Sequence, residues 1–207
     1  MSIKLYGFPI SNYYNMVKAI LIEKGMDFEE VLVKPNQDSD YLSKSPMGKV
    51  PCLETEHGFI SETSVIFDYV DEVGTGQKLM PTDPFERAKT RELIKEIELY
   101  IELPARTCFA EAFFGGSVTD ETKEKAKAAL VKGMACLKRS GKFSPYVAGD
   151  TFTYADIMLM YSVSLAGACG KRVLGMDLMA DAPEVKALVA TLNERESAKT
   201  VAADQKG

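Results

Sequence analysis

The chain of 207 residues has no tryptophan and a single histidine, His57. Its four cysteines, Cys52, Cys108, Cys136 and Cys169, form no Cys-x-x-Cys pair. Zinc sites are commonly built from closely spaced Cys and His, so this pattern argues against a zinc site and against a dithiol redox motif. Unpaired cysteines at these spacings are typical of a reducing compartment, and we expect free thiols and no metal.

The sequence also lacks an excess of basic residues and a long apolar run. Its formal net charge is −5, which gives it no electrostatic reason to bind nucleic acid or anionic lipid. The first residues carry Lys4 and Lys18 and have no uninterrupted apolar core, so we expect no signal peptide. No run approaches the roughly 18 apolar residues of a membrane helix. These features favour a cytoplasmic protein.

What is present begins with a strand and helix pattern typical of an α/β domain. The order β-α-β-α-β-β-α is predicted for residues 3–8, 13–24, 28–33, 41–44, 50–55, 59–61 and a helix from Thr63. The first strand–helix–strand unit favours a parallel pairing. We therefore predict that residues 1–77 form an α/β domain.

The second half of the chain shows only helical periodicity. Residues 74–86 hold two Gly and two Pro; within them, residues 78–86 are the predicted linker, and residues 87–207 the predicted all-α domain. Helices are expected over residues 86–114, 119–139 and 153–167 and from Pro183 onward. Pro104 should kink or break the first of them. The tail after Glu196 has weak periodicity, and we expect it to fray.

Four segments together resemble the glutathione transferase family, in its soluble, bacterial-type form. They are YGFPISNYYNMVKAILIEKG, SPMGKVPCLE, FISETSVIFDYV and GDTFTYADIML. They are similar to the first strand, catalytic loop and first helix of the family, its cis-proline loop, its Glu-Ser motif and the capping box of its central helix. The resemblance implies a thioredoxin-like domain followed by a helical-bundle domain, with glutathione as co-substrate.

The resemblance assigns two pairs of residues to glutathione. It implies a cis bond before Pro51, which turns the backbone N–H and C=O of Val50 toward the cysteinyl backbone of glutathione, as in an added strand. Glu62 and Thr63 stand at a helix start, where free N–H groups and the helix dipole suit the γ-glutamyl carboxylate. A plain trans proline and ordinary helix capping are the alternative interpretations from the local sequence alone.

Ser11 is the candidate for activating the thiol, because its hydroxyl can donate to a thiolate just before the first helix. The alternative is that Ser11 or Asn12 only caps this helix. Family branches differ in this role, so Asn12 and the nearby Tyr6, Tyr13 and Tyr14 stay open as candidates.

Two further sets of residues follow from the resemblance. Polar residues in flanking loops, Asn36, Gln37 and Lys49, match positions that bind the glycyl carboxylate, with plain solvation as the alternative. The pocket for the second substrate would be lined by Tyr100, Arg106, Phe109 and Phe113, together with Phe114; bundle core is the alternative for each.

The resemblance therefore implies a glutathione transferase that binds glutathione, stabilises its thiolate and conjugates it to an electrophilic, hydrophobic substrate, as in detoxification. The family is usually homodimeric, so we expect a homodimer. Two alternatives stay open: another glutathione-dependent enzyme, such as a peroxidase, isomerase or dehalogenase, and a non-catalytic protein of the same fold.

Overall fold

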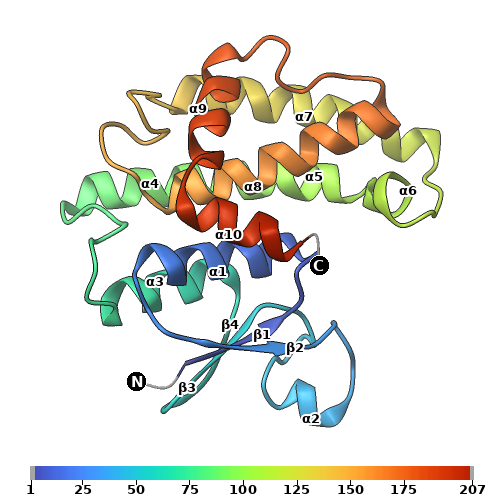
Figure 1. Ribbon diagram of the computed structural model, residues 1–207. Coiled ribbons are helices and arrows are strands. Elements are labelled where there is room, and N and C mark those ends of the chain that lie inside the picture. Colours follow the sequence, from blue (N-terminus) through green and yellow to red (C-terminus); the bar gives the residue numbers. More distant parts are fainter. Residues whose placement is uncertain (1–2, 206–207) are drawn as a thin grey trace. The chain divides into compact units, whose positions relative to one another are not determined.

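The computed structural model describes residues 3–205 and consists of two units (Figure 1). The first unit holds the chain up to Leu79 together with the residues from Glu194 onward. The second unit is Met80–Asn193. The change from one unit to the other falls within the segment predicted as a linker, residues 78–86.

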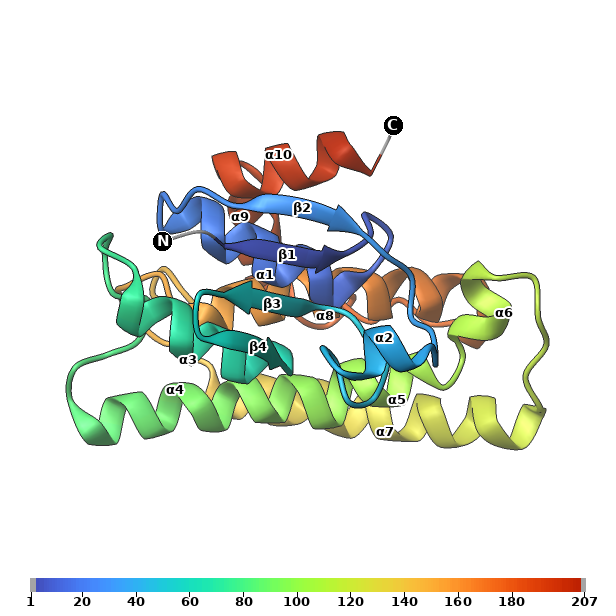
Figure 2. The same cartoon turned by 90° about the horizontal axis from the view of Figure 1, so that it is seen from below.

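A four-stranded sheet forms the centre of the first unit, in the order β2-β1-β3-β4 (Figure 2). Its strands are β1 (Lys4–Gly7), β2 (Glu29–Leu32), β3 (Cys52–Thr55) and β4 (Gly58–Ser61). Strands β1 and β2 are parallel, as predicted, whereas β3 is antiparallel to both β1 and β4. Leu5 and Leu53, which are register partners, are fully buried.

The helices of the first unit are α1 (Asn12–Glu23), α2 (Ser39–Leu42), α3 (Thr63–Val73) and α10 (Glu196–Asp204). Helix α1 packs against both α3 and α10. Nearly every residue of α1 is buried, among them Val17, Ile20 and Leu21, because it is covered on more than one side.

One buried ion pair joins the far ends of α1 and α3. The Lys24 ammonium lies 3.1 Å from Asp71 Oδ1 and also donates to the carbonyls of Gly76 and Gln77. The same Asp71 oxygen accepts from the N–H of Leu79 at 2.9 Å. The buried charges of Lys24 and Asp71 therefore pair with each other, and the cluster fixes the exit of the chain from the first unit.

The second unit is all-helical. Its helical segments are α4 (Pro84–Ile97), the π-helical η1 (Glu98–Glu102), α5 (Leu103–Arg106), α6 (Phe109–Phe113), α7 (Asp120–Ser140), α8 (Tyr154–Cys169), the π-helical η2 (Gly170–Leu174) and α9 (Pro183–Asn193). Helix α8 packs against α4, η1, α5, α6 and α9, so it forms the centre of this unit.

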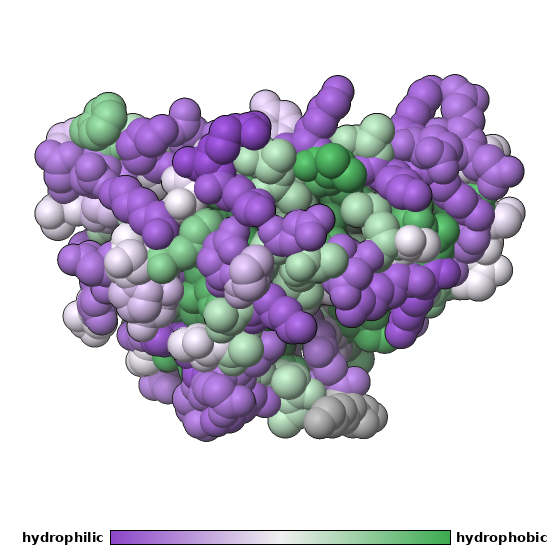
Figure 3. Space-filling view, turned by 90° about the horizontal axis from the view of Figure 1, so that it is seen from above, coloured by the Kyte–Doolittle hydropathy of each residue, from purple (hydrophilic) through white to green (hydrophobic). Residues whose placement is uncertain are grey.

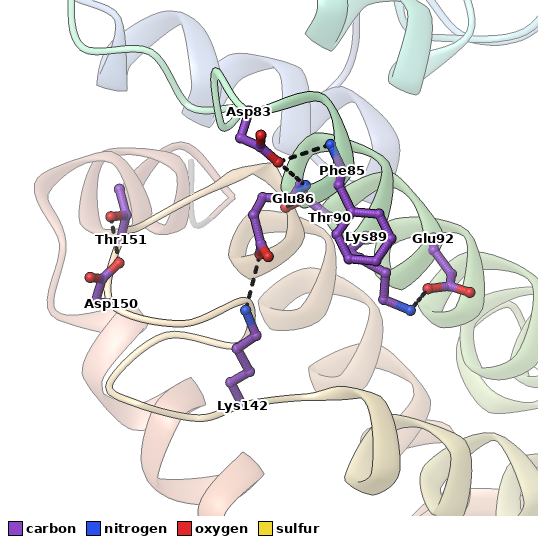
Figure 4. Close-up of polar contacts among 9 residues, drawn as sticks. All are labelled: Asp83, Phe85, Glu86, Lys89, Thr90, Glu92, Lys142, Asp150 and Thr151. Atoms are coloured by element: carbon purple, nitrogen blue, oxygen red, sulfur yellow. Dashed lines mark hydrogen bonds and ion pairs between the residues drawn. The ribbon is translucent and has the colours of Figure 1, made fainter.

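Helix α4 begins at a well-defined cap (Figure 4). The Asp83 carboxylate accepts from the N–H groups of Phe85 and Glu86, and Pro84 occupies the first turn, where no N–H is needed. Lys142 from the loop after α7 reaches the Glu86 carboxylate at 3.1 Å. Local sequence therefore decides where the helical unit begins.

Helix α8 begins at the capping box predicted from the sequence. The Thr153 side chain accepts from Ala155 N–H, and the buried Asp156 accepts from the Thr153 N–H at 2.8 Å. Asp156 also accepts from the N–H of Val147, so it joins the preceding loop to the helix. Asp156 thus has a role in folding, as the sequence indicated.

One helical stretch contradicts the expectation that no segment matches a membrane helix. The helical stretch Tyr154–Leu174 is long and apolar enough to cross a membrane by length and composition, and 61% of its most apolar window is buried. That burial, with helices packed around it, is typical of the core helix of a bundle. The face drawn in Figure 3 is mostly hydrophilic, with hydrophobic residues in small groups.

Two other expectations also change. Regular α-helix ends at Ile97, seven residues before Pro104, because the π-helical η1 intervenes and Pro104 stands in the first turn of α5. The tail does not fray: Glu196–Asp204 is a helix, which buries Ala198 and Val201. Since it packs on α1, this segment groups with the first unit.

Candidate glutathione site

The register of the sheet brings the loops of all four strands to one end of it. Tyr6 in β1 pairs with Cys52 in β3, and Cys52 pairs with Ser61 in β4. Gly7, the last residue of β1, is the partner of Leu32, the last residue of β2. The loops that leave β1, β2 and β4 and the loop that enters β3 therefore meet at the same end of the sheet, called the site end below.

Ser11 ends the loop after β1 and is the N-cap of α1. Its Oγ accepts a hydrogen bond from the N–H of Tyr14 at 3.4 Å, and its own N–H donates to Phe8 O at 3.0 Å. The capping role is therefore real. It uses only the oxygen as an acceptor, and the Ser11 hydroxyl donates to no group in residues 3–205.

Asn12, the first residue of α1, is 9% exposed, and its Nδ2 has no hydrogen-bond partner among the described residues. A buried amide without a partner is uncommon, because it loses its hydration without compensation. The α1 N-terminus thus presents two side chains with unused donors, Ser11 and Asn12.

The loop entering β3 carries the predicted cis bond, between Val50 and Pro51. Val50 is buried, yet neither its N–H nor its C=O is hydrogen-bonded within the described chain. The preceding carbonyl, of Lys49, accepts from Tyr41 Oη at 2.9 Å and from Ser45 Oγ at 2.8 Å. A rigid support therefore holds two unpaired backbone groups at the site end.

Glu62 and Thr63 stand where β4 passes into α3. Glu62 is the N-cap residue with φ 70° and ψ 116°, and its exposed side chain makes no capping bond. A non-glycine residue at positive φ costs about 1–3 kcal/mol and is common at functional sites. Thr63 is buried, and within the described residues neither its N–H nor its Oγ1 has a partner. Unused donors thus stand at a helix N-terminus, an arrangement suited to an anion.

Asn36 and Gln37 lie in the loop after β2, and their side chains brace that loop. Asn36 Oδ1 accepts from the Asp38 N–H at 3.0 Å, and Gln37 Nε2 donates to Met47 O at 3.3 Å. Gly48 is at positive φ and has no room for a Cβ, which would lie 2.0 Å from Asn36 O. Both side chains therefore have structural partners, while the side chain of Lys49 is exposed.

Comparison with known proteins identifies the family. The glutathione S-transferase N-terminal domain model matches residues 5–76, and the C-terminal domain model matches residues 106–203. A glutathione S-transferase of Pseudomonas putida (strain F1) is 58% identical over 203 residues, which is 98% of this chain and 92% of the relative. The chain belongs to the glutathione transferase family.

Solved structures agree with this assignment. Glutathione transferase F7 from Populus trichocarpa is 28% identical with a TM-score of 0.76, over 98% of this chain and 99% of that one. A maleylacetoacetate isomerase from Methylobacterium extorquens AM1, solved with bound malonate and GSH, is 25% identical with a TM-score of 0.75, over 96% and 95% of the two chains. The predicted architecture, thioredoxin-like then helical, is confirmed.

In this transferase, two of the candidate tyrosines have hydroxyls already engaged by carboxylates. Tyr6 donates to Glu54, and burial together with this hydrogen bond raises the pKa of Tyr6 to about 12. Tyr14 donates to Glu30, and burial followed by this bond raises the pKa of Tyr14 further. A hydroxyl held by an anion is a poor donor to a second anion, so these two tyrosines are unsuited to stabilise a thiolate.

The residues predicted for the second substrate belong to the second unit of the transferase. Arg106 binds the fully buried Glu102, and its guanidinium lies 5.2 Å from the Phe109 ring centroid. Phe109 meets Phe113 edge to face at 5.1 Å, and Arg172 lies 5.0 Å from the Phe113 centroid.

Four of the five predicted residues, Arg106, Phe109, Phe113 and Phe114, are thus brought together. Phe109 is core, 6% exposed, as the alternative interpretation had it. Tyr100 is half exposed on η1, and Phe114, 69% exposed, contacts Phe113 edge to face.

Sequence reasoning missed Lys18 and its partners. Lys18 lies on the buried face of α1 and binds Glu30 of β2 and Asp204 of α10. A signal was available, because a lysine among apolar residues of a helix needs a partner. The sequence could not identify Asp204 as a partner, because it lies 186 residues from Lys18 along the chain.

Proposed function

We propose that the first unit binds glutathione at the site end of its sheet and activates its thiol for attack on an electrophilic carbon. The observation that carries this proposal is the set of unused groups there: the Val50 backbone, the Thr63 N–H and hydroxyl, and the Ser11 hydroxyl. Donors and acceptors that the fold leaves unused at one end of a sheet are available to a polar ligand, and the buried Asn12 Nδ2 beside them also has no partner among the described residues.

The γ-glutamyl end of glutathione suits the start of α3. Its carboxylate takes the Thr63 N–H and hydroxyl at the positive end of the helix dipole. Its ammonium pairs with the Glu62 carboxylate, which is exposed and has no partner among residues 3–205. Adjacent residues therefore bind the two charges of the ligand: Thr63 the carboxylate and Glu62 the ammonium.

The rest of the tripeptide follows the loop into β3. Its cysteinyl backbone pairs with the Val50 N–H and C=O, as an added strand would. The glycyl carboxylate lies toward the loops of Asn36, Gln37 and Lys49. Because the side chains of Asn36 and Gln37 already have partners, Lys49 is the charge best suited to this carboxylate.

Ser11 stabilises the thiolate by donating its hydroxyl hydrogen, while its oxygen continues to cap α1. Lowering a thiol pKa from about 8.5 by two units needs about 2.7 kcal/mol of differential stabilisation. One hydrogen bond to a charge supplies about 1.5–3 kcal/mol, so this bond with the helix N-terminus is sufficient. Asn12 Nδ2 is a second donor within the same turn.

We further propose that the electrophile is apolar and contacts Tyr100, Arg106, Phe109 and Phe113 of the second unit. Conjugation to such compounds is a detoxification reaction. Four free cysteines fit a reducing, cytoplasmic compartment. A homodimer is proposed as the assembled form, and sedimentation velocity tests it.

The experiment compares wild type with Ser11→Ala and Ser11→Gly, following thiolate absorbance of bound glutathione against pH and turnover of an aryl halide. Glycine is a tolerated N-cap whereas alanine is not, so the pair separates capping from chemistry. We expect both variants to bind glutathione, and both to lose the lowered thiol pKa. If both retain it, Ser11 is not the activating group and Asn12 is tested next. If wild type does not bind glutathione, the proposal fails.

Isomerisation is the second candidate, because one neighbour of known structure is a maleylacetoacetate isomerase. The same thiolate would add to a conjugated double bond and leave again after rotation. A panel holding an aryl halide and a cis-configured unsaturated diacid distinguishes the two, since isomerisation consumes no glutathione.

A further inference from the structure

The carbonyl of Pro9 is held by two amides from opposite ends of the sequence. Asn15 Nδ2 of α1 donates to it at 2.8 Å, and Gln205 Nε2, just after α10, donates at 3.2 Å. Pro9 is two residues before Ser11, in the turn closed by the bond from Ser11 N–H to Phe8 O. The C-terminal segment therefore contacts the turn that presents the Ser11 hydroxyl.

Asp204, in the last turn of α10, makes a second contact with α1, through Lys18. The Lys18 ammonium, with a side chain 5% exposed, lies 2.6 Å from Glu30 Oε1 and 2.5 Å from Asp204 Oδ2. The other oxygen of Glu30 accepts from the Tyr14 hydroxyl, and the Tyr14 N–H donates to Ser11 Oγ. Hydrogen bonds therefore link Asp204 through Lys18 and Glu30 to the hydroxyl of Tyr14, and the backbone of the same tyrosine binds Ser11.

The other end of α10 is fixed as well. Arg195 donates through Nε and Nη2 to both oxygens of Glu23, at 2.8 and 2.7 Å, and Ser197 also donates to Glu23. Helix α10 is therefore bound at its start to the end of α1, and at its end to the start of α1 (Figure 1).

We propose that α10 positions the Ser11 turn, with Asp204 and Gln205 as the positioning residues. The contact formed by Asp204 and Gln205 with Lys18 and Pro9 is called the α10 contact. This inference rests on the proposed function, because the position of the turn affects thiol ionisation only if the Ser11 hydroxyl donates to the thiolate. A hydrogen bond to a reacting atom depends steeply on distance, so a small displacement of the turn weakens it.

This proposal differs from a purely structural role for α10. A structural role alone would lower the melting temperature and leave the remaining folded enzyme normal. A positioning role changes the ionisation of the bound thiol, while the affinity for glutathione is kept by Val50, Glu62 and Thr63, which the α10 contact does not touch.

The test compares Gln205→Ala and the double variant Asp204→Asn/Gln205→Ala with Glu196→Gln. Glu196 is the matched control, because it is an exposed acid of the same helix with no ion pair in the described chain. Three quantities are measured: the thiolate fraction of bound glutathione against pH, the Kd for glutathione, and amide hydrogen exchange of residues 8–15 in the free enzyme.

We expect the ratio of thiolate to thiol in bound glutathione to fall by about 3- to 10-fold in the double variant at any given pH, which is a rise of about 0.5 to 1 in the thiol pKa. Its Kd for glutathione should stay within about twofold, and residues 8–15 should exchange faster, with no change in the control. If thiolate fraction and exchange match the control, the proposal is overturned. Should the double variant fail to fold, Gln205→Ala alone decides by the same measurements.

Failure of the proposed function is seen separately. If wild type binds no glutathione, that function falls, and hydrogen exchange still decides the α10 contact. Faster exchange of residues 8–15 in the double variant only would support it, and equal exchange in all variants would overturn it.

Discussion

Thr63 offers the sharpest test of the glutathione site, because its hydroxyl does nothing for the fold. Thr63 is 7% exposed, and its Oγ1 makes no hydrogen bond within the described residues. The N-cap position of α3 belongs to Glu62, so Thr63 does not cap the helix either. Thr63→Val has nearly the same shape and removes only the hydroxyl, whereas Thr63→Ser keeps it.

The effects of Thr63→Val on stability and on binding should differ. Stability should stay within about 1 kcal/mol of wild type, because the hydroxyl makes no hydrogen bond within the described residues that valine would lose. Glutathione binding should weaken, because a hydrogen bond to a charged carboxylate contributes about 1.5–3 kcal/mol, which is about 10- to 150-fold in Kd.

Isothermal titration calorimetry measures the Kd, and thermal unfolding the stability. Thr63→Ser is the control, and it should bind glutathione within about threefold of wild type. The reasoning is refuted if Thr63→Val binds as tightly as wild type, or if it loses binding only because it unfolds.

Three further predictions concern the frame of the first unit. Lys24→Met leaves the buried Asp71 carboxylate without its counter-charge, so the free energy of unfolding in urea should fall by about 3–5 kcal/mol. Glu62→Gly should raise stability by about 1 kcal/mol by relieving its positive φ, while glutathione affinity falls; Glu62→Gln, which keeps the backbone, should lose affinity without that gain. Burial alone would raise the pKa of Glu23, but hydrogen bonds and charge from Arg195 lower it overall. Because the pKa of Glu23 is lower in the folded protein, its ionisation stabilises the fold fully above the unfolded pKa of about 4.5. This stabilisation is lost as the pH falls through the folded pKa. Arg195→Gln should therefore cost about 1 kcal/mol at pH 7 and progressively less below pH 4.5, by melting temperature against pH.

Local patterns sufficed to predict most of the elements and the positions of the site. The alternation around Glu56, His57 and Gly58 gave the hairpin of β3 and β4, and the T-x-x-D pattern gave the start of α8. These features depend on neighbours within a few residues. The site residues came from the family resemblance, since a proline or a serine before a helix has several interpretations.

The features that were missed depend on contacts between distant parts of the chain. Helix α10 packs on α1 and buries three small residues, Ser197, Ala198 and Val201. Their weak hydrophobic periodicity does not indicate from the sequence which face of the helix is buried. The π-helical η1 forms where Gly133 lets the backbone of α7 approach Tyr100 O, a contact the local sequence does not contain. The cis bond between Ser144 and Pro145 had no signal that separated it from a trans proline.

The contrast between satisfied and unsatisfied groups is the strongest physical argument for a ligand at the site end. Elsewhere in the first unit, buried charges such as Lys24 and Asp71 are fully paired. At the site end, Val50 and Thr63 keep unused donors, and Glu62 holds an unfavourable backbone. The positive φ of Glu62 lowers the stability of the free protein, and the groups of Val50 and Thr63 have no partner within the described fold. A ligand that takes up these unused groups stabilises the folded protein on binding, and a dipolar peptide such as glutathione carries the groups to do so.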